Sequence, residues 1–250
     1  MISVCIATYN GEKHIKEQLD SILCQLGDND EIIISDDNST DKTIEIINSY
    51  HDNRIKIFHH RQNEKLLTMR ASPFRLAANN FENAIKNAQG DCIYLSDQDD
   101  IWLPDRIIKT QFYLKQYDLV MCNYKVIDGK GDILVNEFHH KNPISKSLLK
   151  NILTLPFRGC CMSFRKEILS YCMPFSKSCI GHDYWIGCMV QLWGNIKYVD
   201  EPLHLYRRNL KNVSFDSGKS ENPLWFKIFY RIRFVCQMMA RSLVVCLNKT

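Results

Sequence analysis

The residues best suited to catalysis lie in one acidic run, Asp97-Gln98-Asp99-Asp100, which follows the apolar segment Cys92–Ser96. Three carboxylates within four residues repel one another, and burying one of them without a counter-charge is costly. A divalent cation removes this repulsion, because carboxylate oxygens suit Mg²⁺ or Mn²⁺. Alternation along the chain places Asp97 and Asp99 on one side, so we expect these two residues to hold the ion. A solvated turn is the alternative.

A second polar cluster begins with Asp36 and Asp37, directly after the apolar segment Glu31–Ser35. A carboxylate at this position can accept a hydrogen bond from the imide N–H of a pyrimidine base. Helix N-capping is the alternative for the cluster. Capping accounts for its later members, at positions 39–41, better than for the two aspartates.

A third polar cluster, Thr8-Tyr9-Asn10, follows the apolar segment Ile2–Ala7. The Tyr9 ring can stack on a base, and the backbone or hydroxyl of Thr8 can hold the edge of that base. We expect all three residues to contribute to nucleotide binding, because ligands of parallel α/β sheets bind beyond the carboxyl ends of the strands.

The elements that must position these clusters alternate between strand and helix in the first hundred residues. Apolar runs indicate strands, and apolar residues three and four apart indicate helices. This alternation predicts βαβ units and a mainly parallel sheet. The expected strands are Ile2–Ala7, Glu31–Ser35, Ile55–His59 and Cys92–Ser96, and the expected helices are His14–Leu26, Lys42–Tyr50 and Phe81–Ala88.

The second half has a less regular pattern, which predicts a smaller, more antiparallel subregion. A hairpin is expected over 126–133, because turn residues stand there between apolar flanks. The segment Arg61–Ala78 has no clean period, so we expect a functional loop that closes over the site. Further expected elements are a strand at Gly159–Phe164, a helix at Asp183–Trp193 and a strand at Ile196–Val199.

From Pro223 onward the sequence predicts one long basic amphipathic helix. Apolar residues at steps of three and four form one stripe, and from Leu205 onward nine Lys/Arg stand against two acidic residues. The stripe suits either peripheral contact with an anionic membrane or packing on the chain's own domain or on a second copy in a homodimer. A membrane-spanning helix is excluded by Arg233 and Arg241. The stripe comprises Trp225, Ile228, Ile232, Val235, Met239, Leu243 and Cys246.

Amino-acid composition limits the class of protein, the partners and the cellular compartment that we expect. The 250 residues are 45% hydrophobic and 24% charged, which is typical of a globular domain and excludes a disordered or fibrous chain. The net charge of +4 does not call for nucleic acid as a partner. Eleven cysteines without a C-x-x-C pair or a preceding signal peptide indicate buried reduced thiols in a cytoplasmic protein.

The three polar clusters also carry a resemblance to a known family. The runs 7–10, 35–41 and 80–102, the last ending in LSDQDD-I-W, resemble family 2 glycosyltransferases with the GT-A fold, and the branch that includes bacterial rhamnosyltransferases in particular. The resemblance covers residues 1–215. It implies an α/β, Rossmann-like fold with a mainly parallel central sheet flanked by helices. Residues 1–100 would form the half that binds the nucleotide sugar, 101–215 the acceptor half, and 216–250 a basic helical tail.

The activity that this resemblance implies is an inverting, metal-dependent transfer of a sugar from a UDP- or dTDP-linked donor. The acceptor would be a hydroxyl of a glycan or a lipid-linked glycan in cell-surface polysaccharide synthesis. The chain would then be cytoplasmic, or peripheral on the inner face of the cell membrane.

The resemblance also implies roles for single residues. Asp36 or Asp37 would bind the base, Asp97 would lie near the ribose and the metal, and Asp99 would ligate Mn²⁺ or Mg²⁺. Asp183 would be the catalytic base, with His182 as the rival because the intrinsic pKa of histidine lies near neutrality. The loop 159–162 would line the sugar and acceptor pocket. Arg207 would neutralise the leaving phosphate, whereas Asn209 stands where relatives often have a histidine.

Two other functions remain as alternatives. A catalytically inactive relative that binds nucleotide sugars or glycans is favoured only by Asn209. A nucleotidyltransferase would need a Gly-rich, basic loop after the first strand to hold a triphosphate, and the segment 8–12 is neither Gly-rich nor basic.

Overall fold

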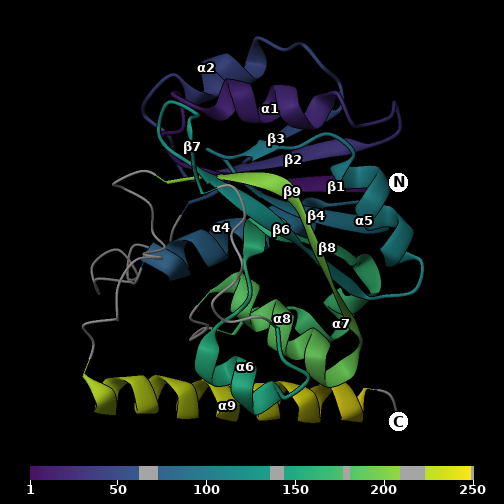
Figure 1. Ribbon diagram of the computed structural model, residues 1–250, viewed down its shortest axis with the longest axis vertical. Coiled ribbons are helices and arrows are strands. Elements are labelled where there is room, and N and C mark those ends of the chain that lie inside the picture. Colours follow the sequence, from purple (N-terminus) through teal and green to yellow (C-terminus); the bar gives the residue numbers. More distant parts are fainter. Residues whose placement is uncertain (62–72, 136–143, 177–180, 209–222, 249–250) are drawn as a thin grey trace.

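The computed structural model describes residues 1–61, 73–135, 144–176, 181–208 and 223–248. Within these ranges the strands form a single curled sheet in the order β3-β2-β1-β4-β8-β6-β9-β5, and β7 pairs with β6. Helices cover both faces of this sheet (Figure 1). The chain therefore has the mixed α/β architecture that the sequence predicts.

The N-terminal half is the parallel part of the sheet. Its strands are β1 (Ile2–Thr8), β2 (Glu31–Asp36), β3 (Ile55–His59) and β4 (Cys92–Asp97), and all neighbouring pairs among them run parallel. Apolar side chains on both faces of β1, β2 and β4 are buried, which explains their continuous apolar sequences. One face carries α1 (Ile15–Leu23) and α2 (Thr43–Asn48), and the other carries α4 (Pro73–Asn87) (Figure 1).

Helix α4 begins earlier than the sequence pattern suggests. It starts at Pro73, so the predicted loop Arg61–Ala78 is wrong for residues 73–78. Proline is favoured in the first turn of a helix because its missing N–H has no partner there in any case. Ala78, Phe81 and Ile85 then continue a buried stripe along the helix. Residues 62–72 of the predicted loop lie outside the described residues.

The C-terminal half adds antiparallel pairs. Strand β8 (Met162–Arg165) pairs antiparallel with both β4 and β6 (Leu119–Ile127), and β7 (Ile133–Val135) completes the predicted hairpin with β6. The predicted strand Gly159–Phe164 is only half right, because residues 159–161 form a 3₁₀ turn before β8. The fifth strand, β5 (Ile101–Trp102), and helix α5 (Arg106–Leu114) follow the acidic run.

Strand β9 (Ile196–Arg207) is much longer than the expected Ile196–Val199. It runs parallel to β6 in two stretches, with register shifts around Asn123. Along the second stretch its other edge pairs antiparallel with β5. The interruption at Pro202 hides the second stretch from a pattern search, since proline is a poor strand residue. The extension brings Arg207 to the tip of β4.

Below the sheet in Figure 1 lie α6 (Leu148–Thr154), α7 (Leu169–Cys172) and α8 (His182–Trp193), and the long helix α9 (Leu224–Leu247) lies beneath them. The predicted tail helix is therefore present. Its buried side chains are Phe234, Met238 and Val245, whereas most of the predicted stripe is exposed. None of the helices in the described ranges combines the length and the apolarity needed to cross a bilayer.

The cysteines follow the expectation of reduced thiols. All ten that fall within the described ranges are free, and most of them are buried. Burial raises the pKa of the Cys5, Cys172 and Cys188 thiols, which keeps them protonated at neutral pH.

Candidate active site

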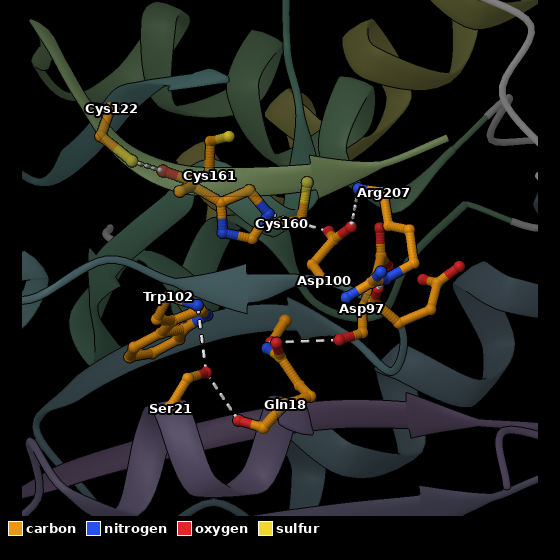
Figure 2. A network of polar contacts seen from close by, with 12 residues as sticks. Gln18, Ser21, Asp97, Asp100, Trp102, Cys122, Cys160, Cys161 and Arg207 are labelled. Carbon is orange, nitrogen blue, oxygen red and sulfur yellow. Dashed lines mark hydrogen bonds and ion pairs between the residues drawn. The ribbon is translucent and has the colours of Figure 1, made fainter. Parts of the chain in front are cut away.

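The acidic run lies at the tip of β4, where the chain turns after Asp97. Ligand atoms of Asp97, Asp100 and Cys160 all come within 4.8 Å of one another. Strand alternation does not predict this grouping, because the strand ends at Asp97 and a turn at 98–99 brings Asp100 back toward it. Figure 2 shows the two carboxylates and the thiol facing the same space.

Negative charge accumulates around Asp97. Burial raises the pKa of its carboxyl well above the usual range, and the charges of Asp100, Asp99 and Asp183 raise the pKa further. Carboxylates gathered in this way favour a bound divalent cation, which compensates the charge that they share. The carboxylates at the tip of β4 thus suit the Mn²⁺ or Mg²⁺ that the sequence suggests, although the grouped pair is Asp97 with Asp100 rather than the predicted Asp97 with Asp99.

Asp100 anchors the far end of β9 to this tip. Its side chain is 1% exposed, and its two oxygens lie 2.8 Å from His204 Nε2 and 2.8 Å from the backbone N–H of Arg207. The other ring nitrogen of His204 lies 2.6 Å from the Arg106 guanidinium, which can only donate. His204 therefore carries its hydrogen on Nε2, and this N–H donates a hydrogen bond to Asp100. Burial lowers the pKa of His204, in keeping with this neutral tautomer.

Arg207 is a buried cation of the site, 1% exposed, and its guanidinium makes several hydrogen bonds. Its guanidinium donates to the backbone oxygen of Asp99 at 2.8 Å, to that of Asp128 at 3.2 Å and to Glu17 Oε2 at 2.5 Å. These bonds fix the backbone of the acidic run against α1 and the β6–β7 hairpin. The predicted contact of Arg207 with a leaving phosphate remains a proposal, and sequence reasoning missed the partner Glu17.

At the ends of β1 and β2, Asp36 is enclosed by the protein. Its carboxylate accepts hydrogen bonds from Thr8 Oγ1 at 2.9 Å and from the backbone N–H and hydroxyl of Ser39 at 2.9 and 2.5 Å. The residue is 1% exposed, whereas Asp37 is half-buried. The backbone N–H of Asp37 donates to the Thr8 carbonyl at 2.9 Å. Of the two predicted base-binding carboxylates, Asp37 is thus the more exposed.

Gln98 joins the first polar cluster to the acidic run. Its amide accepts from the Tyr9 N–H at 2.9 Å and donates to the Tyr9 carbonyl at 3.0 Å. A Cβ on Gly11 would stand 2.4 Å from Gln98 Oε1, so glycine is needed there for this approach. The Tyr9 side chain itself is 58% exposed and available for stacking. Sequence reasoning missed the role of Gln98.

Asn10 connects β1 to the loop after β2. It has a φ of 49°, and its side-chain oxygen accepts from the Thr40 N–H at 2.8 Å. Its own N–H donates to the Ser39 hydroxyl at 3.0 Å. The prediction that Ser39 and Thr40 cap α2 is therefore wrong, because both are used by other partners. Lys42 stands at the N-cap position without a capping bond from its side chain, and the carboxylate of Asp41, one residue earlier, accepts from the Thr43 N–H at 3.0 Å.

Asp183 lies in the first turn of α8, at the edge of the same space. Its carboxylate accepts from the Tyr184 N–H at 2.8 Å and from the Gly159 N–H at 3.3 Å. Gly159 directly precedes Cys160, whose thiol is grouped with Asp97 and Asp100, so this hydrogen bond holds Asp183 near the acidic run. Asp183 is half-buried, whereas its neighbours His182 and Tyr184 are buried.

His182, the rival base, is 8% exposed. Its ring stacks on Phe81 with ring centroids 4.0 Å apart, and burial lowers its pKa. A Cβ on Gly159 would stand 2.5 Å from His182 Nε2, so the ring occupies the space that this glycine leaves free. Its enclosure makes His182 less suited than Asp183 to meet an acceptor hydroxyl.

A parallel N-terminal half, an acidic run at the tip of its fourth strand and a carboxylate at the start of a helix in the other half agree with the GT-A type of glycosyltransferase that the sequence resembles. The family model "Glycosyl transferase family 2" matches residues 3–172. The chain belongs to this family.

Two curated relatives show the range of the likeness. The Escherichia coli protein WfgD, a UDP-Glc:alpha-D-GlcNAc-diphosphoundecaprenol beta-1,3-glucosyltransferase, is 30% identical over 94% of this chain and 92% of its own length. The dTDP-rhamnosyl transferase RfbG of Shigella flexneri is 29% identical over 83% of this chain and 72% of its own length. The latter agrees with the predicted resemblance to the rhamnosyltransferase branch.

Solved structures confirm the predicted GT-A fold. S. aureus TarS 1–349 in complex with UDP-GlcNAc superposes with a TM-score of 0.66 at 18% identity, covering 94% of this chain and 66% of that one. The chain thus spans just under two thirds of that TarS fragment. Glucosyl-3-phosphoglycerate synthase from Mycobacterium tuberculosis, in complex with Mn²⁺, UDP and glucosyl-3-phosphoglycerate, gives a TM-score of 0.56 at 19% identity, covering 96% and 79%.

Proposed function

We propose that this glycosyltransferase moves a sugar, with inversion and with the help of Mn²⁺ or Mg²⁺, from a UDP- or dTDP-linked donor to a hydroxyl of a glycan or lipid-linked glycan. The observation that carries the proposal is the convergence of the acidic run at the tip of β4 with Asp183 at the start of α8. The names of WfgD and RfbG support the donor and acceptor classes.

The donor would lie across the carboxyl ends of β1, β2 and β4. Asp37 is our choice for the carboxylate that accepts from the imide of the base, because Asp36 is enclosed by Thr8 and Ser39. Tyr9 presents an exposed ring on which the base can stack. Asn10 and Thr8 would act through the backbone that they hold in place, since their side chains bind within the protein.

The cation would be held by Asp97 and by Asp99, with Asp100 and Cys160 at its edge. A bound Mn²⁺ or Mg²⁺ would supply Lewis-acid stabilisation of the charge on the departing diphosphate. Arg207 fixes the backbone of Asp99, so its first task is to keep the carboxylates of the run in place. The crystal of the Mycobacterium tuberculosis synthase with Mn²⁺ and UDP supports the choice of ion.

Asp183 would act as the general base in a single displacement. Its carboxylate takes the proton of the acceptor hydroxyl as the oxygen attacks the anomeric carbon from the face opposite the diphosphate. The bond between the sugar and the diphosphate breaks, and the nucleoside diphosphate leaves. A carboxylate suffices because the hydroxyl becomes acidic only as bond formation advances.

A panel of UDP- and dTDP-sugars with and without Mn²⁺, followed by release of the nucleoside diphosphate, tests this function. Wild type should turn over one donor class with the metal, and Asp99→Ala and Asp183→Asn should lose turnover. Asp183→Asn should bind the donor as wild type does. Full turnover by Asp183→Asn would refute the base assignment, and absence of nucleotide-sugar binding by folded wild type would refute the function as a whole.

A further inference from the structure

Helix α9 presents an apolar face to the outside of the molecule. Figure 1 shows α9 along the edge of the molecule opposite α1 and α2, with α6 beside it. Large apolar side chains on this side are between 50% and 73% exposed. We call these residues, together with two leucines of α6, the docking face: Trp225, Ile228, Phe229, Ile232, Met239, Leu243, Leu247, Leu149 and Leu153.

The opposite side of α9 is fixed to the domain, so its orientation is set by packing. Phe234 stacks on Tyr184 at 4.4 Å between ring centroids and meets the edge of Trp185 at 5.8 Å. Arg231 donates to the Leu153 carbonyl at 2.9 Å, and Arg241 donates to the Tyr171 carbonyl at 3.0 Å. These contacts leave the docking face turned away from the protein along a helix about 36 Å long.

The charged residues within the two segments that carry the docking face are all of one sign. Helix α9 contains four Lys/Arg and no Asp or Glu, and the segment 144–154, which includes α6, adds Lys146 and Lys150 with no acidic residue. Arg233, Lys146 and Lys150 are exposed. Cations beside an apolar face complement an anionic lipid surface, into which such a helix sinks by about 5–10 Å.

A second copy of the chain fits this face less well. A symmetric dimer places the same patch of both protomers in contact, so the exposed cations Arg233, Lys146 and Lys150 would come near their own copies. No carboxylate in either segment offsets that repulsion. We propose that the docking face binds the surface of an anionic lipid bilayer and lies parallel to it, without crossing it.

Docking would set the direction in which the active site opens. Asp183 directly precedes Tyr184 and Trp185, the residues that seat Phe234 of α9. A bilayer against α9 would therefore lie on the side of α8, the helix that carries the base. This orientation suits an acceptor anchored in the same bilayer, and it rests on the proposed function, whereas docking itself does not.

Flotation of the full chain with vesicles tests the proposal directly. The probes are phosphatidylcholine vesicles with and without phosphatidylglycerol. Binding should require the anionic lipid and weaken with salt, and the emission of the exposed Trp225 should shift to the blue. Ile232→Glu with Leu243→Glu should weaken binding by at least about tenfold. Replacing Lys146, Lys150 and Arg233 by Gln should weaken it by about fivefold for each cation.

Ile108→Glu with Phe112→Glu on α5 is the matched control, because both side chains are exposed to a similar degree, 69% and 62%, on another helix. This variant should bind vesicles as wild type does. Equal binding by the α9 variant, or a stable dimer in solution that the α9 variant dissociates, would overturn the proposal. Turnover with a water-soluble acceptor is measured in parallel, so loss of docking and loss of transfer are told apart.

Discussion

Gly159→Ala probes the link between the 3₁₀ turn at 159–161 and Asp183, the proposed base. The new Cβ would stand 2.5 Å from His182 Nε2, whereas ordinary contacts begin near 3.4 Å. The imidazole must therefore retreat by about 0.9 Å. Phe81 stacks on its ring and resists that movement, so the first turn of α8, with Asp183, moves instead. A misplacement near 1 Å lowers the rate of a positioned reaction by about a hundredfold.

The assay compares kcat with donor binding. Gly159→Ala should lower kcat by about a hundredfold, leave the Kd for UDP within a factor of about two, and lower the free energy of unfolding by about 1–3 kcal/mol through overpacking. Gly27→Ala is the control, because its Cβ meets only Asp30 Oδ2 at 3.6 Å. A folded Gly159→Ala protein with wild-type kcat would refute the placement of the base, and a parallel loss of UDP binding would refute its separation from the donor site.

Three further predictions concern the charges of the site. Asp97→Asn should raise the melting temperature of the metal-free protein, because the raised pKa of Asp97 marks a carboxylate whose ionisation opposes folding at neutral pH. The same substitution should abolish the rise in melting temperature that Mn²⁺ gives wild type. Arg207→Met should lower the free energy of unfolding in urea by about 2 kcal/mol, since the carbonyls of Asp99 and Asp128 lose their donor. The folded-state pKa values of His182 and His204 lie below 6.5, so the free energy of unfolding should fall as the pH is lowered below 6.5. Each ring lowers it by up to about 1.4 kcal/mol per pH unit. Urea titrations should show a shallower decline for His182→Gln, because this variant lacks one of the two rings.

The sequence predicts the parallel half of this fold well, because apolar runs and helical spacing are local signals there. Strands β1 to β4 lie within a residue of their expected ends. The second part of β9 and the 3₁₀ turn at 159–161 escape prediction, because distant partners rather than local pattern determine them. Helix α9 shows the same limit. Its apolar stripe is visible in the sequence, but its packing through Phe234 on α8 reveals which side is buried.

Within the site, residue types suggest which carboxylates take part, and these roles stay predictions; how the carboxylates are held cannot be predicted from residue types. The neutral His204 between Asp100 and Arg106 has no signature in the sequence, because it lies 104 positions after Asp100 in a strand with an ordinary pattern. Glu17 is equally hidden, since a single acid on a helix is most often only solvated.

The pair of hydrogen bonds between Gln98 and the backbone of Tyr9 acts as a rung between two loops that are 89 positions apart. The backbone of Tyr9 and the carboxylates on either side of Gln98 are consequently held together. A donor that moves this backbone would displace the acids as well, so we expect the affinities for the base and for the ion to be coupled. Tuning one of them by mutation near residue 9 or residue 98 will alter the other in step.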